Sequence, residues 1–325
     1  MNKALFILGP TGVGKTALGL ELASKFQGNI LSIDSVQVYK GLDVISGKDI
    51  PPQSFFSDTS KLFPNLNNSY SIGFYSFNST PAFLLDIVSP TFNFSVSNFL
   101  DCALPVAEFT VSQKKLPIFV GGTGLYAKAL LEGIETESIQ PNKKLREDLE
   151  KLSIEELIIL LKEKNLARFG QMTPSDKKNK RRLIRNIEIV NSPKEETVSR
   201  RLENYDAFQI ALFCDRVELR QRIEERVMAR IKQGAVAEAE HIFKNYKSLS
   251  PQVKNANGYK QLFEYLLGQA TYDTAIEKWK ISEYRHAKNQ MTWFRKDKKN
   301  HWFNILEDGF QDKLEKEVTD WYNKK

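Results

Sequence analysis

Apolar residues in the first part of the chain form short runs, with a stretch of helical spacing between them. Residues 4–8 are all apolar, and after a glycine-rich turn the stretch 15–26 repeats its leucines at the spacing of one helix face. A second stretch of strand character, which includes Ile30, Leu31 and Ile33, covers residues 29–33. This order predicts a strand, a helix and a second strand, a unit that is typical of parallel sheets.

A third buried strand is predicted further along, where the apolar run 117–120 is followed by the glycine pair 121–122. Leu125 and Leu130 then return to helical spacing. We therefore expect another strand and helix of the same type, added to the same parallel sheet.

The spacing changes from about residue 142 onward, where leucine and isoleucine recur at helical intervals. The apolar positions of this region are Leu145, Leu149, Leu152, 157–161, Leu183, Ile184 and Ile187. We predict a separate helical domain over residues 136–204, inserted between the two parts of an α/β core, 1–135 and 205–325.

Two long helices are predicted in the second part of the core. Asp215, with Glu218 three residues later, resembles a capping box that opens the first helix, and the second runs from about 274 to 295. The apolar face expected for the first helix is Leu219, Ile223, Val227 and Ile231. Residues 51–81 are rich in Ser, Asn, Phe and Pro without clear periodicity, so we expect an irregular insertion there.

The composition narrows the class of protein. Hydrophobic residues make up 41% and charged residues 27% of the 325 residues, a balance typical of a globular chain. No apolar run approaches the roughly 20 residues that span a bilayer, and the N-terminal run is too short for a secretory signal. We expect a cytoplasmic protein with no membrane association.

Charge and cysteine content narrow the partners. The formal net charge of +7 favours an anionic partner, and nucleic acid is the leading candidate. Cys102 and Cys214 lie far apart in the sequence and share no motif. Neither a disulfide framework nor a four-ligand zinc site is therefore expected.

The glycine-rich turn matches the phosphate-binding pattern G-x-x-x-x-G-K-[ST] in full. Its residues are Gly9, Pro10, Thr11, Gly12, Val13, Gly14, Lys15 and Thr16. Backbone amides of such a loop converge on phosphate oxygens, Lys15 adds positive charge, and the Thr16 hydroxyl offers a ligand for Mg²⁺. The motif selects a diphosphate, in ATP or in another compound. With the strand pattern, it predicts an α/β fold: a P-loop NTPase-like parallel sheet core with an inserted helical domain.

Polar residues follow two further strands at the same edge of the predicted sheet. Asp34 comes directly after the second predicted strand, where a carboxylate can bind magnesium, take a proton from a nucleophile or only cap a turn. Thr123 follows the third strand. Asp86, after an apolar triplet, is a further candidate for a carboxylate behind a magnesium ion. Because parallel strands end at one edge, we expect Lys15, Asp34 and Thr123 in one pocket.

Two basic clusters follow in the second half of the chain. Arg181, Arg182 and Arg185 share one side of a predicted helix, which suits a phosphate backbone, although such clusters are usually only solvated. The second cluster mixes cations with aromatic rings: Arg285, Lys288, Trp293, Phe294, Arg295, Lys296, Lys298, Lys299 and Trp302. This composition suits an unpaired base stacked on a ring. The rings can equally cap the core.

Together these motifs resemble one family, the tRNA dimethylallyltransferases, also called tRNA isopentenyltransferases. The segments that carry the resemblance are 9–16, 34–43 with the pattern D-S-x-Q-x-Y-x-G-x-D, 120–126, 181–185, 258–261 and 287–295. They follow the order of the family and extend over most of the chain. The resemblance implies transfer of a dimethylallyl group from dimethylallyl diphosphate to N6 of the adenosine immediately 3′ of the anticodon in tRNA, with release of diphosphate.

The resemblance also implies roles for single residues. The phosphate loop holds the diphosphate, and Thr16 does so together with Mg²⁺. Asp34 is the general base that takes the proton from N6. Lys15 and Thr123 complete the catalytic group with Arg222 or Arg226, one of which neutralises the departing diphosphate. Contacts with the tRNA anticodon stem-loop are implied for Asp34, Ser35, Val36, Gln37, Thr123, Arg181, Arg182, Leu183, Ile184, Arg185, Gly258, Tyr259, Lys260, Gln261, Lys288, Gln290, Trp293 and Arg295. We expect a monomer.

The chain departs from the family pattern at three places. Ala82-Phe83 stand where many bacterial members carry two histidines, Glu283-Tyr284 replace a usual Thr-Arg, and the insertion at 51–81 is longer than typical. Three alternative functions stay open. They are a P-loop kinase that uses ATP, an adenylate isopentenyltransferase that acts on free nucleotide, and a nucleic-acid-binding module without catalysis. The first two leave the basic helices unexplained, and the third leaves Asp34 beside a complete phosphate loop unexplained.

Overall fold

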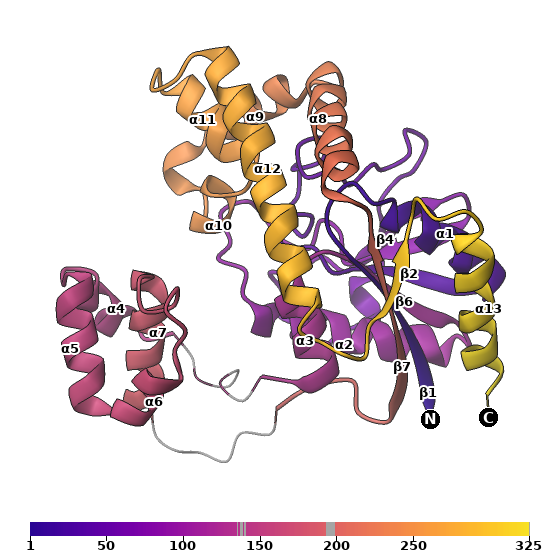
Figure 1. Cartoon of the computed structure of the whole chain (residues 1–325), viewed down its shortest axis with the longest axis horizontal. Helices are drawn as coiled ribbons and strands as arrows, with labels where there is room; N and C mark the ends of the chain where they lie inside the picture. The colour runs from indigo at the N-terminus through magenta and orange to yellow at the C-terminus, as the bar shows by residue number, and fades with distance from the viewer. Residues whose placement is uncertain (135, 137–138, 140, 193–198, 325) are drawn as a thin grey trace. The chain divides into compact units, whose positions relative to one another are not determined.

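The computed structural model describes residues 1–134, 136, 139, 141–192 and 199–324. The chain divides into two compact units (Figure 1). The larger unit comprises Met1–Glu132 and Arg201–Lys325, and the smaller unit comprises Gly133–Arg200. Residue 135, where the first segment of the core was expected to end, lies outside the described residues.

The larger unit is built on a sheet with the strand order β3-β4-β5-β2-β6-β1-β7-β8 among its described residues. The strands are β1 (Asn2–Leu8), β2 (Gly28–Ser32), β3 (Ser57–Asp58), β4 (Gly73–Phe77), β5 (Thr80–Phe83), β6 (Leu116–Gly121), β7 (Tyr205–Phe213) and β8 (His301–Asn304). From β5 to β8 in this order, every neighbouring pair is parallel. The predicted α/β core with a parallel sheet is confirmed.

The segment 51–81 is not irregular throughout, so that expectation is wrong for its second half. β4 pairs antiparallel with β5, and β3 with β4, which adds an antiparallel edge to the sheet. Asn78 and Ser79 form the hairpin turn with φ angles of 48° and 69°, a backbone conformation that favours asparagine. The rings of Phe74 and Phe83 lie 5.2 Å apart across the pair. The aromatic residues are therefore strand residues, and their Asn-Ser turn was the overlooked signal.

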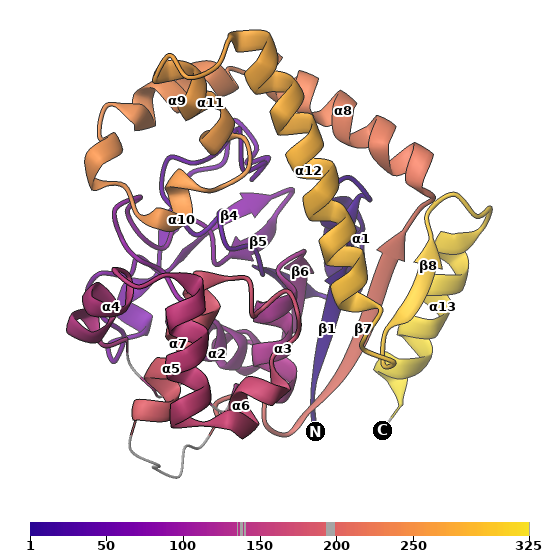
Figure 2. The same cartoon turned by 60° about the vertical axis from the view of Figure 1, so that its left-hand side comes forward.

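Helices cover both faces of the sheet (Figure 2). In the larger unit they are α1 (Lys15–Lys25), α2 (Val96–Ser112), α3 (Gly124–Glu132), α8 (Arg216–Lys232), α9 (Ala235–Phe243), α10 (Pro251–Lys254), α11 (Tyr259–Leu266), α12 (Tyr272–Phe294) and α13 (Phe310–Asn323). Leu5 and Ile7 of β1 pack in the core formed with α1 and α13. Phe6 points to the other face and stacks on Phe119 with ring centroids 4.7 Å apart. Burial on both faces explains the unbroken apolar run of β1.

Helices α8 to α12 continue the chain beyond β7 (Figure 1). The Asp215 side chain caps α8 by accepting two backbone N–H groups at 2.8 and 3.0 Å, so the predicted helix start is confirmed. Glu218 does not complete a capping box, because its carboxylate accepts from Arg222 at 2.5 Å. The fourth buried residue of α8 is Arg230 and not Ile231, which places a cation where an apolar residue was expected.

The smaller unit is helical throughout its regular elements, as predicted. Its described helices are α4 (Lys143–Leu149), α5 (Ile154–Lys164), α6 (Leu166–Gln171) and α7 (Lys180–Asn191). Its own core consists of Leu149, Leu157, Leu161, Met172, Leu183, Ile184 and Ile187. Across both units, none of the described helices is long and apolar enough to cross a membrane.

One buried carboxylate ties the smaller unit together. Glu188 accepts from Nε and Nη2 of Arg146, each at 2.7 Å, and from the backbone N–H of Asn142 at 2.9 Å. Arg185 lies 3.3 Å from the same carboxylate. Burial alone raises the pKa of Glu188, but these hydrogen bonds outweigh it and hold the pKa below the ordinary value.

We expect Glu188→Gln to lower the opening free energy of the smaller unit by about 2 kcal/mol at pH 7, because two guanidinium groups lose their anion. Since the folded pKa is lowered, the wild-type stabilisation is complete above the unfolded pKa of about 4.3 and is lost as the pH falls through the folded pKa. Amide hydrogen exchange of α7 in the full chain measures both effects. Glu147→Gln, at an exposed position, is the control. If the difference in opening free energy between the wild type and Glu188→Gln persisted unchanged in acid, it would contradict the ion-pair explanation.

Candidate active site

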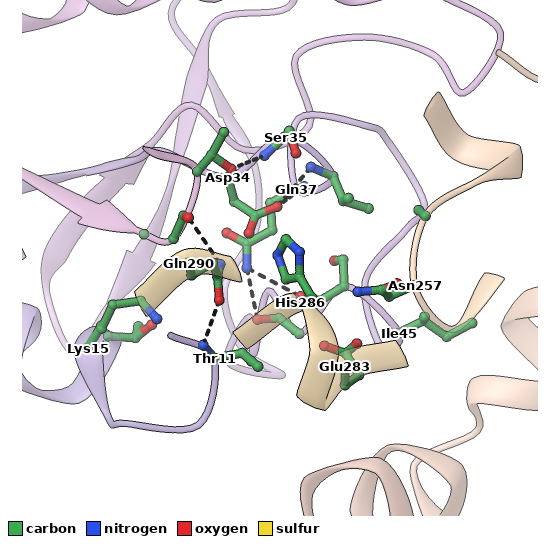
Figure 3. A pocket seen from close by; sticks show the side chains of 18 of the residues that line it. Thr11, Lys15, Asp34, Ser35, Gln37, Ile45, Asn257, Glu283, His286 and Gln290 are labelled. Atoms are coloured by element: carbon green, nitrogen blue, oxygen red, sulfur yellow. Dashed lines mark hydrogen bonds between the residues drawn. The ribbon is translucent and has the colours of Figure 1, made fainter. Parts of the chain in front are cut away.

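A cavity of about 530 Å³ lies in the larger unit, at the carboxyl ends of β1, β2 and β6 (Figure 3). Its lining includes the following residues singled out in the sequence: Thr11, Gly12, Gly14, Lys15, Thr16, Asp34, Ser35, Val36, Gln37, Thr123, Arg226 and Gln290. Lys15, Asp34 and Thr123 thus lie in one pocket, as the parallel strand order predicts. Their chemical roles stay predictions at this point.

The shape of the phosphate loop follows from its glycines. Gly9 has a φ of 141°, and a Cβ there would lie 2.5 Å from the carbonyl oxygen of Leu212 in β7. The loop can therefore leave β1 only with glycine at this position. Gly14 is the N-cap of α1 with a φ of 82° and offers no side-chain cap. The first N–H groups of α1 are left available, which makes the helix start a site for an anion.

Lys15 is the cation within the phosphate loop itself. Its Nζ donates to the carbonyl oxygen of Pro10 at 2.6 Å. Burial and the charge of Arg226 lower the pKa of Lys15 to about 7, and Asp34 opposes this shift. Without an anion, the side chain is therefore only partly protonated at neutral pH. A bound anion would restore the full charge.

Asp34 is held by the turn that follows β2. Its Oδ1 accepts the backbone N–H groups of Val36 and Gln37 at 2.8 and 3.2 Å. Among the described residues, none donates to its other oxygen. Thr123 Oγ1 accepts the N–H of Ser35 at 3.1 Å, which joins the ends of β2 and β6. Asp34 is thus both a turn cap and a carboxylate with one oxygen available to the cavity.

Gln290 connects α12 to the same strand ends. Its Oε1 accepts the N–H of Thr11 at 3.1 Å, and its Nε2 donates to the Gly122 carbonyl at 3.0 Å (Figure 3). A Cβ at Gly122 would collide with this amide. Gln290 therefore fixes the phosphate loop relative to β6. Its expected contact with tRNA stays a prediction.

Of the two candidate arginines, Arg226 lines the cavity and Arg222 does not. Arg222 is paired with Glu218, and its Cβ faces Gly12. Arg226 reaches Asp49 Oδ2 at 3.4 Å, and its charge acts on Lys15. The geometry favours Arg226 as the ligand of an anion in the loop.

Several polar residues of the cavity were missed by the sequence analysis, namely Arg230, Asn255 and His286, and Glu283 was noted only as a departure from the family pattern. Arg230 is 5% exposed, and its Nη1 lies 3.6 Å from Glu283. Burial, with the charge of Arg226, lowers the pKa of Arg230 to about 10, so the guanidinium is still charged at neutral pH. Arg226 and Arg230 are four residues apart and so share a helix face, a signal that the sequence offered.

Comparisons with known proteins identify the family. A family described as IPP transferase matches residues 76–297, and one described as isopentenyl transferase matches residues 2–88. The tRNA dimethylallyltransferase of Lactococcus lactis is 33% identical over 332 residues, with 99% of each chain covered. That of Streptococcus agalactiae is 34% identical over 329 residues, again with 99% of each chain covered. The chain belongs to the tRNA dimethylallyltransferase family.

Solved structures agree with this family assignment. The tRNA isopentenylpyrophosphate transferase of Bacillus halodurans is 28% identical, with a TM-score of 0.68 and coverage of 99% of this chain and 97% of that chain. The corresponding transferase of Staphylococcus epidermidis is 27% identical, with a TM-score of 0.65 and coverage of 98% of this chain and 99% of that chain. A eukaryotic dimethylallyltransferase acting on tRNA shares the fold, with a TM-score of 0.76 at 21% identity. The P-loop NTPase-like core is confirmed.

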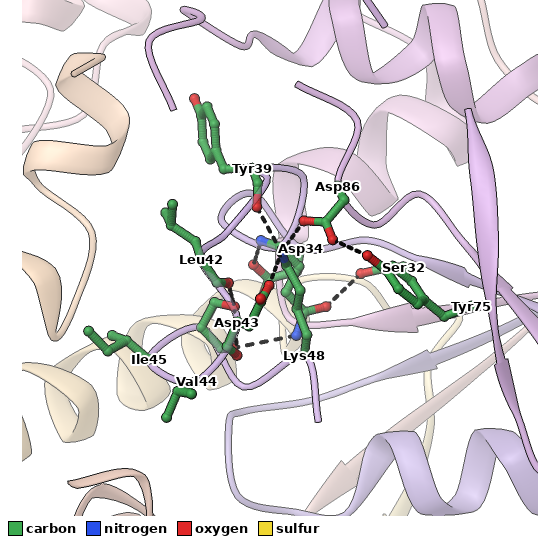
Figure 4. A network of polar contacts seen from close by, with 12 residues as sticks. Ser32, Asp34, Tyr39, Leu42, Asp43, Val44, Ile45, Lys48, Tyr75 and Asp86 are labelled. Carbon is green, nitrogen blue, oxygen red and sulfur yellow. Dashed lines mark hydrogen bonds and ion pairs between the residues drawn. The ribbon is translucent and has the colours of Figure 1, made fainter. Parts of the chain in front are cut away.

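In this member of the tRNA dimethylallyltransferase family, a buried ionic network supports one wall of the cavity. The Lys48 side chain is fully buried, and its Nζ donates to the Tyr39 carbonyl at 2.7 Å and to Asp43 Oδ1 at 2.7 Å (Figure 4). Lys48 also pairs with Asp86, which accepts from Tyr75 Oη at 2.5 Å. Asp86 does not line the cavity. Asp86 and Asp43 are the anions that neutralise Lys48, and the interpretation of Asp86 as a carboxylate behind a magnesium ion stays a prediction.

The loop that Lys48 anchors is held from its other side by α9. The Glu238 carboxylate accepts three consecutive backbone N–H groups, those of residues 43–45, at 2.8, 2.7 and 3.0 Å, and the Tyr259 hydroxyl at 2.5 Å. Within the loop, the carbonyl of Gly47 accepts from Gln37 Nε2 at 3.0 Å. A Cβ at Gly47 would collide with the guanidinium groups of α8. Two anchors thus place the loop between the Asp34 turn and the arginines.

The residues expected to bind tRNA differ in exposure. On α7 of the smaller unit, Arg181 and Arg182 are exposed, whereas Leu183 and Ile184 are buried in the core of that unit. Arg185 donates to two backbone carbonyls of its own unit, at 2.9 and 2.8 Å. In the larger unit the exposed members are Ser35, Lys260, Lys288, Trp293 and Arg295, the buried ones are Gly258, Tyr259, Gln261 and Gln290, and the half-buried ones are Asp34, Val36, Gln37 and Thr123. The exposed side chains, and the half-buried ones that line the cavity, are available to RNA without rearrangement.

We expect Lys48→Met to lower the free energy of unfolding by about 3 kcal/mol, because it leaves Asp86 buried without its cation. Lys48→Met combined with Asp86→Leu should recover most of this loss, since the two buried charges are then both removed. Chemical denaturation of the wild type, Lys48→Met, Asp86→Leu and the double variant measures the differences. If the double variant were as unstable as the sum of both single variants, the two residues would not be coupled.

Proposed function

We propose that this protein transfers a dimethylallyl group from dimethylallyl diphosphate to N6 of the adenosine immediately 3′ of the anticodon in tRNA and releases diphosphate. The observation that carries the proposal is the free carboxylate oxygen of Asp34 in the cavity lined by the complete phosphate loop. Relatives with the same name as the proposed activity cover 99% of the chain. As part of the proposal, the protein acts in the cytoplasm as a monomer.

The phosphate loop holds the diphosphate of the donor. The N-terminal amides of α1, Lys15 and Arg226 provide positive charge before the reaction begins. When the carbon–oxygen bond to the diphosphate breaks, negative charge grows on the leaving group, and charges that are already in place stabilise it without reorganisation. Protonation of Lys15 on donor binding strengthens this effect, because the pKa of Lys15 near 7 leaves room for proton uptake.

Magnesium fits the same place. The Thr16 side chain lines the cavity in the first turn of α1, next to Lys15, and Mg²⁺ commonly takes one or two protein oxygens together with substrate phosphate oxygens. Thr16 is the residue that would hold it. A bound Mg²⁺ would supply further neutralisation of the diphosphate charge.

Asp34 activates the acceptor. The exocyclic amine of adenine is a poor nucleophile, so its proton must leave as the new carbon–nitrogen bond forms. The free oxygen of Asp34 accepts this proton, and Ser35 and Thr123 lie beside it to contact the base. The adenosine must first leave the stack of the anticodon loop, which costs a few kcal/mol. Exposed cations, among them Arg181 and Lys288, offset this cost by binding the backbone.

Transfer is tested with labelled dimethylallyl diphosphate and an unmodified tRNA anticodon stem-loop. We expect Asp34→Asn to lower kcat by roughly 10²–10⁴-fold, while RNA affinity stays near the wild-type value, because the amide oxygen still caps the turn. Free AMP as acceptor and ATP as phosphoryl donor are the comparison reactions. Efficient transfer to AMP, or phosphoryl transfer from ATP, would favour the alternative functions. Wild-type kcat in the variant would remove Asp34 from the mechanism.

Arg226 and Arg222 form a matched pair on α8. We expect Arg226→Gln to lower kcat by roughly 10²-fold, because a preorganised charge at the leaving group is lost. Arg222→Gln should leave kcat near the wild-type value, because Arg222 is paired with Glu218 outside the cavity lining. Steady-state kinetics with saturating RNA decide between them. If Arg222→Gln lowered kcat and Arg226→Gln did not, Arg222 would be the residue that neutralises the diphosphate.

A further inference from the structure

Residues 43–49 form a loop that touches two side chains of the cavity. The Gly47 carbonyl accepts from Nε2 of Gln37 at 3.0 Å. At the same residue, a Cβ would lie 2.3 Å from Nη2 of Arg226, so the loop backbone packs directly against this guanidinium. Asp49 Oδ2 lies 3.4 Å from the same Nη2. The loop therefore determines how Gln37 and Arg226 are placed in the cavity.

The backbone of this loop is held by one carboxylate from a distant part of the chain. Glu238 of α9 accepts the N–H groups of Asp43, Val44 and Ile45, which follow one another in Figure 4. Within the described part of the chain, no other acceptor takes these three N–H groups. Hydrogen bonds to a carboxylate are roughly twice as strong as those between neutral groups. Because the Gly47 N–H donates to the Val44 carbonyl at 3.1 Å, the position of Gly47 follows from that of the clamped residues.

The carboxylate is itself oriented from α11. The hydroxyl of the buried Tyr259 donates to Oε1 of Glu238 at 2.5 Å. Burial and the charge of Glu238 raise the pKa of this hydroxyl well above its ordinary value, so it stays protonated and donates. A Cβ at the neighbouring Gly258 would collide with Ile45 and Trp279, so the loop also packs on the start of α11. Glu238 therefore joins the loop to a helix whose start is already packed against it.

We propose that Glu238 is a positioning residue of the donor site, which acts through the loop on Arg226. Glu238 does not line the cavity, so it has no direct contact with the anion site. With the loop clamped, the Arg226 guanidinium is held in the cavity in advance, and an anion that binds a side chain already in place loses less conformational entropy. The inference rests on the proposed function, in which Arg226 faces the diphosphate. A purely structural role for Glu238 predicts instead a loss of stability with no change in anion affinity.

The test is a double-mutant cycle of Glu238→Gln and Arg226→Gln, measured as the affinity of the full chain for inorganic diphosphate with Mg²⁺. Glutamine keeps the size of Glu238 but turns an amide NH₂ group towards backbone donors, which releases the loop. We expect Glu238→Gln to weaken diphosphate binding about three- to tenfold, the effect of one side chain that must be ordered on binding. In the Arg226→Gln background the same substitution should have almost no effect, because the residue through which it acts is absent. Isothermal titration calorimetry measures the four affinities.

Two further variants separate positioning from folding. Glu240→Gln, at an exposed position of the same helix, is the control and should bind diphosphate like the wild type. Tyr259→Phe keeps the ring and removes only the hydroxyl that orients the carboxylate, so it should produce a smaller loss in the same direction. The binding stoichiometry reports the folded fraction, so an unstable variant lowers the stoichiometry and not the affinity of the molecules that bind. Amide hydrogen exchange at residues 43–45 should be faster in Glu238→Gln.

The same fold loss in both backgrounds would show that Glu238 does not act through Arg226 and would overturn the proposal. Full affinity in Glu238→Gln with faster exchange at residues 43–45 would also overturn it, because the loop would then be released without consequence for the anion. No prenyl transfer enters these measurements. A wild type that binds diphosphate with this coupling but transfers nothing would therefore remove only the proposed function.

Discussion

The parallel pairing of β1, β6 and β2 is the constraint on which the site depends. Its register sets Phe6 beside Phe119 and Ile30 beside Ile118, so the three strands end at one edge of the sheet. Two side-chain bridges then join the ends: Thr123 with the backbone of Ser35, and Gln290 between Thr11 and Gly122. A slip of one residue would turn each side chain to the opposite face, and the carboxylate would no longer share a cavity with the phosphate loop.

The electrostatics of the cavity indicate a site built for an anion. Lys15, Arg226 and Arg230 lie in one buried space, and burial lowers the pKa of both Lys15 and Arg230 because a charged group loses its water there. Asp49 and Glu283 pair with the two arginines, and the charge of Asp34 acts on Lys15. A diphosphate at the phosphate loop would add negative charge beside these cations. The free protein thus carries an electrostatic cost that donor binding removes, and the same cations face the leaving group as its charge increases.

The parts of the site that the sequence predicted are those encoded locally. The phosphate loop is eight consecutive residues, Asp34 directly follows Ile33 at the end of a predicted strand, and Thr123 follows another predicted strand after two glycines. The parts that were missed depend on partners distant in the chain. Lys48 reads only as a surface cation until the fold brings Asp86 to it, and Glu238 only as an exposed acid until it meets the N–H groups of residues 43–45, about 195 positions away. The hairpin of β4 and β5 was missed because its aromatic residues obscured the alternation.

Helix α12 connects the locally encoded phosphate loop with residues that are distant from it in the chain. Gln290 and Trp293 are three residues apart and so lie on one side of the helix. Gln290 contacts the phosphate loop, whereas the Trp293 indole covers Gly124 of α3. A displacement of α12 would therefore act on the backbone of Thr11 as well as on Gly124. Within the loop Lys15 holds the Pro10 carbonyl, and from outside the loop the Gln290 amide makes the geometry of the phosphate loop depend on α12.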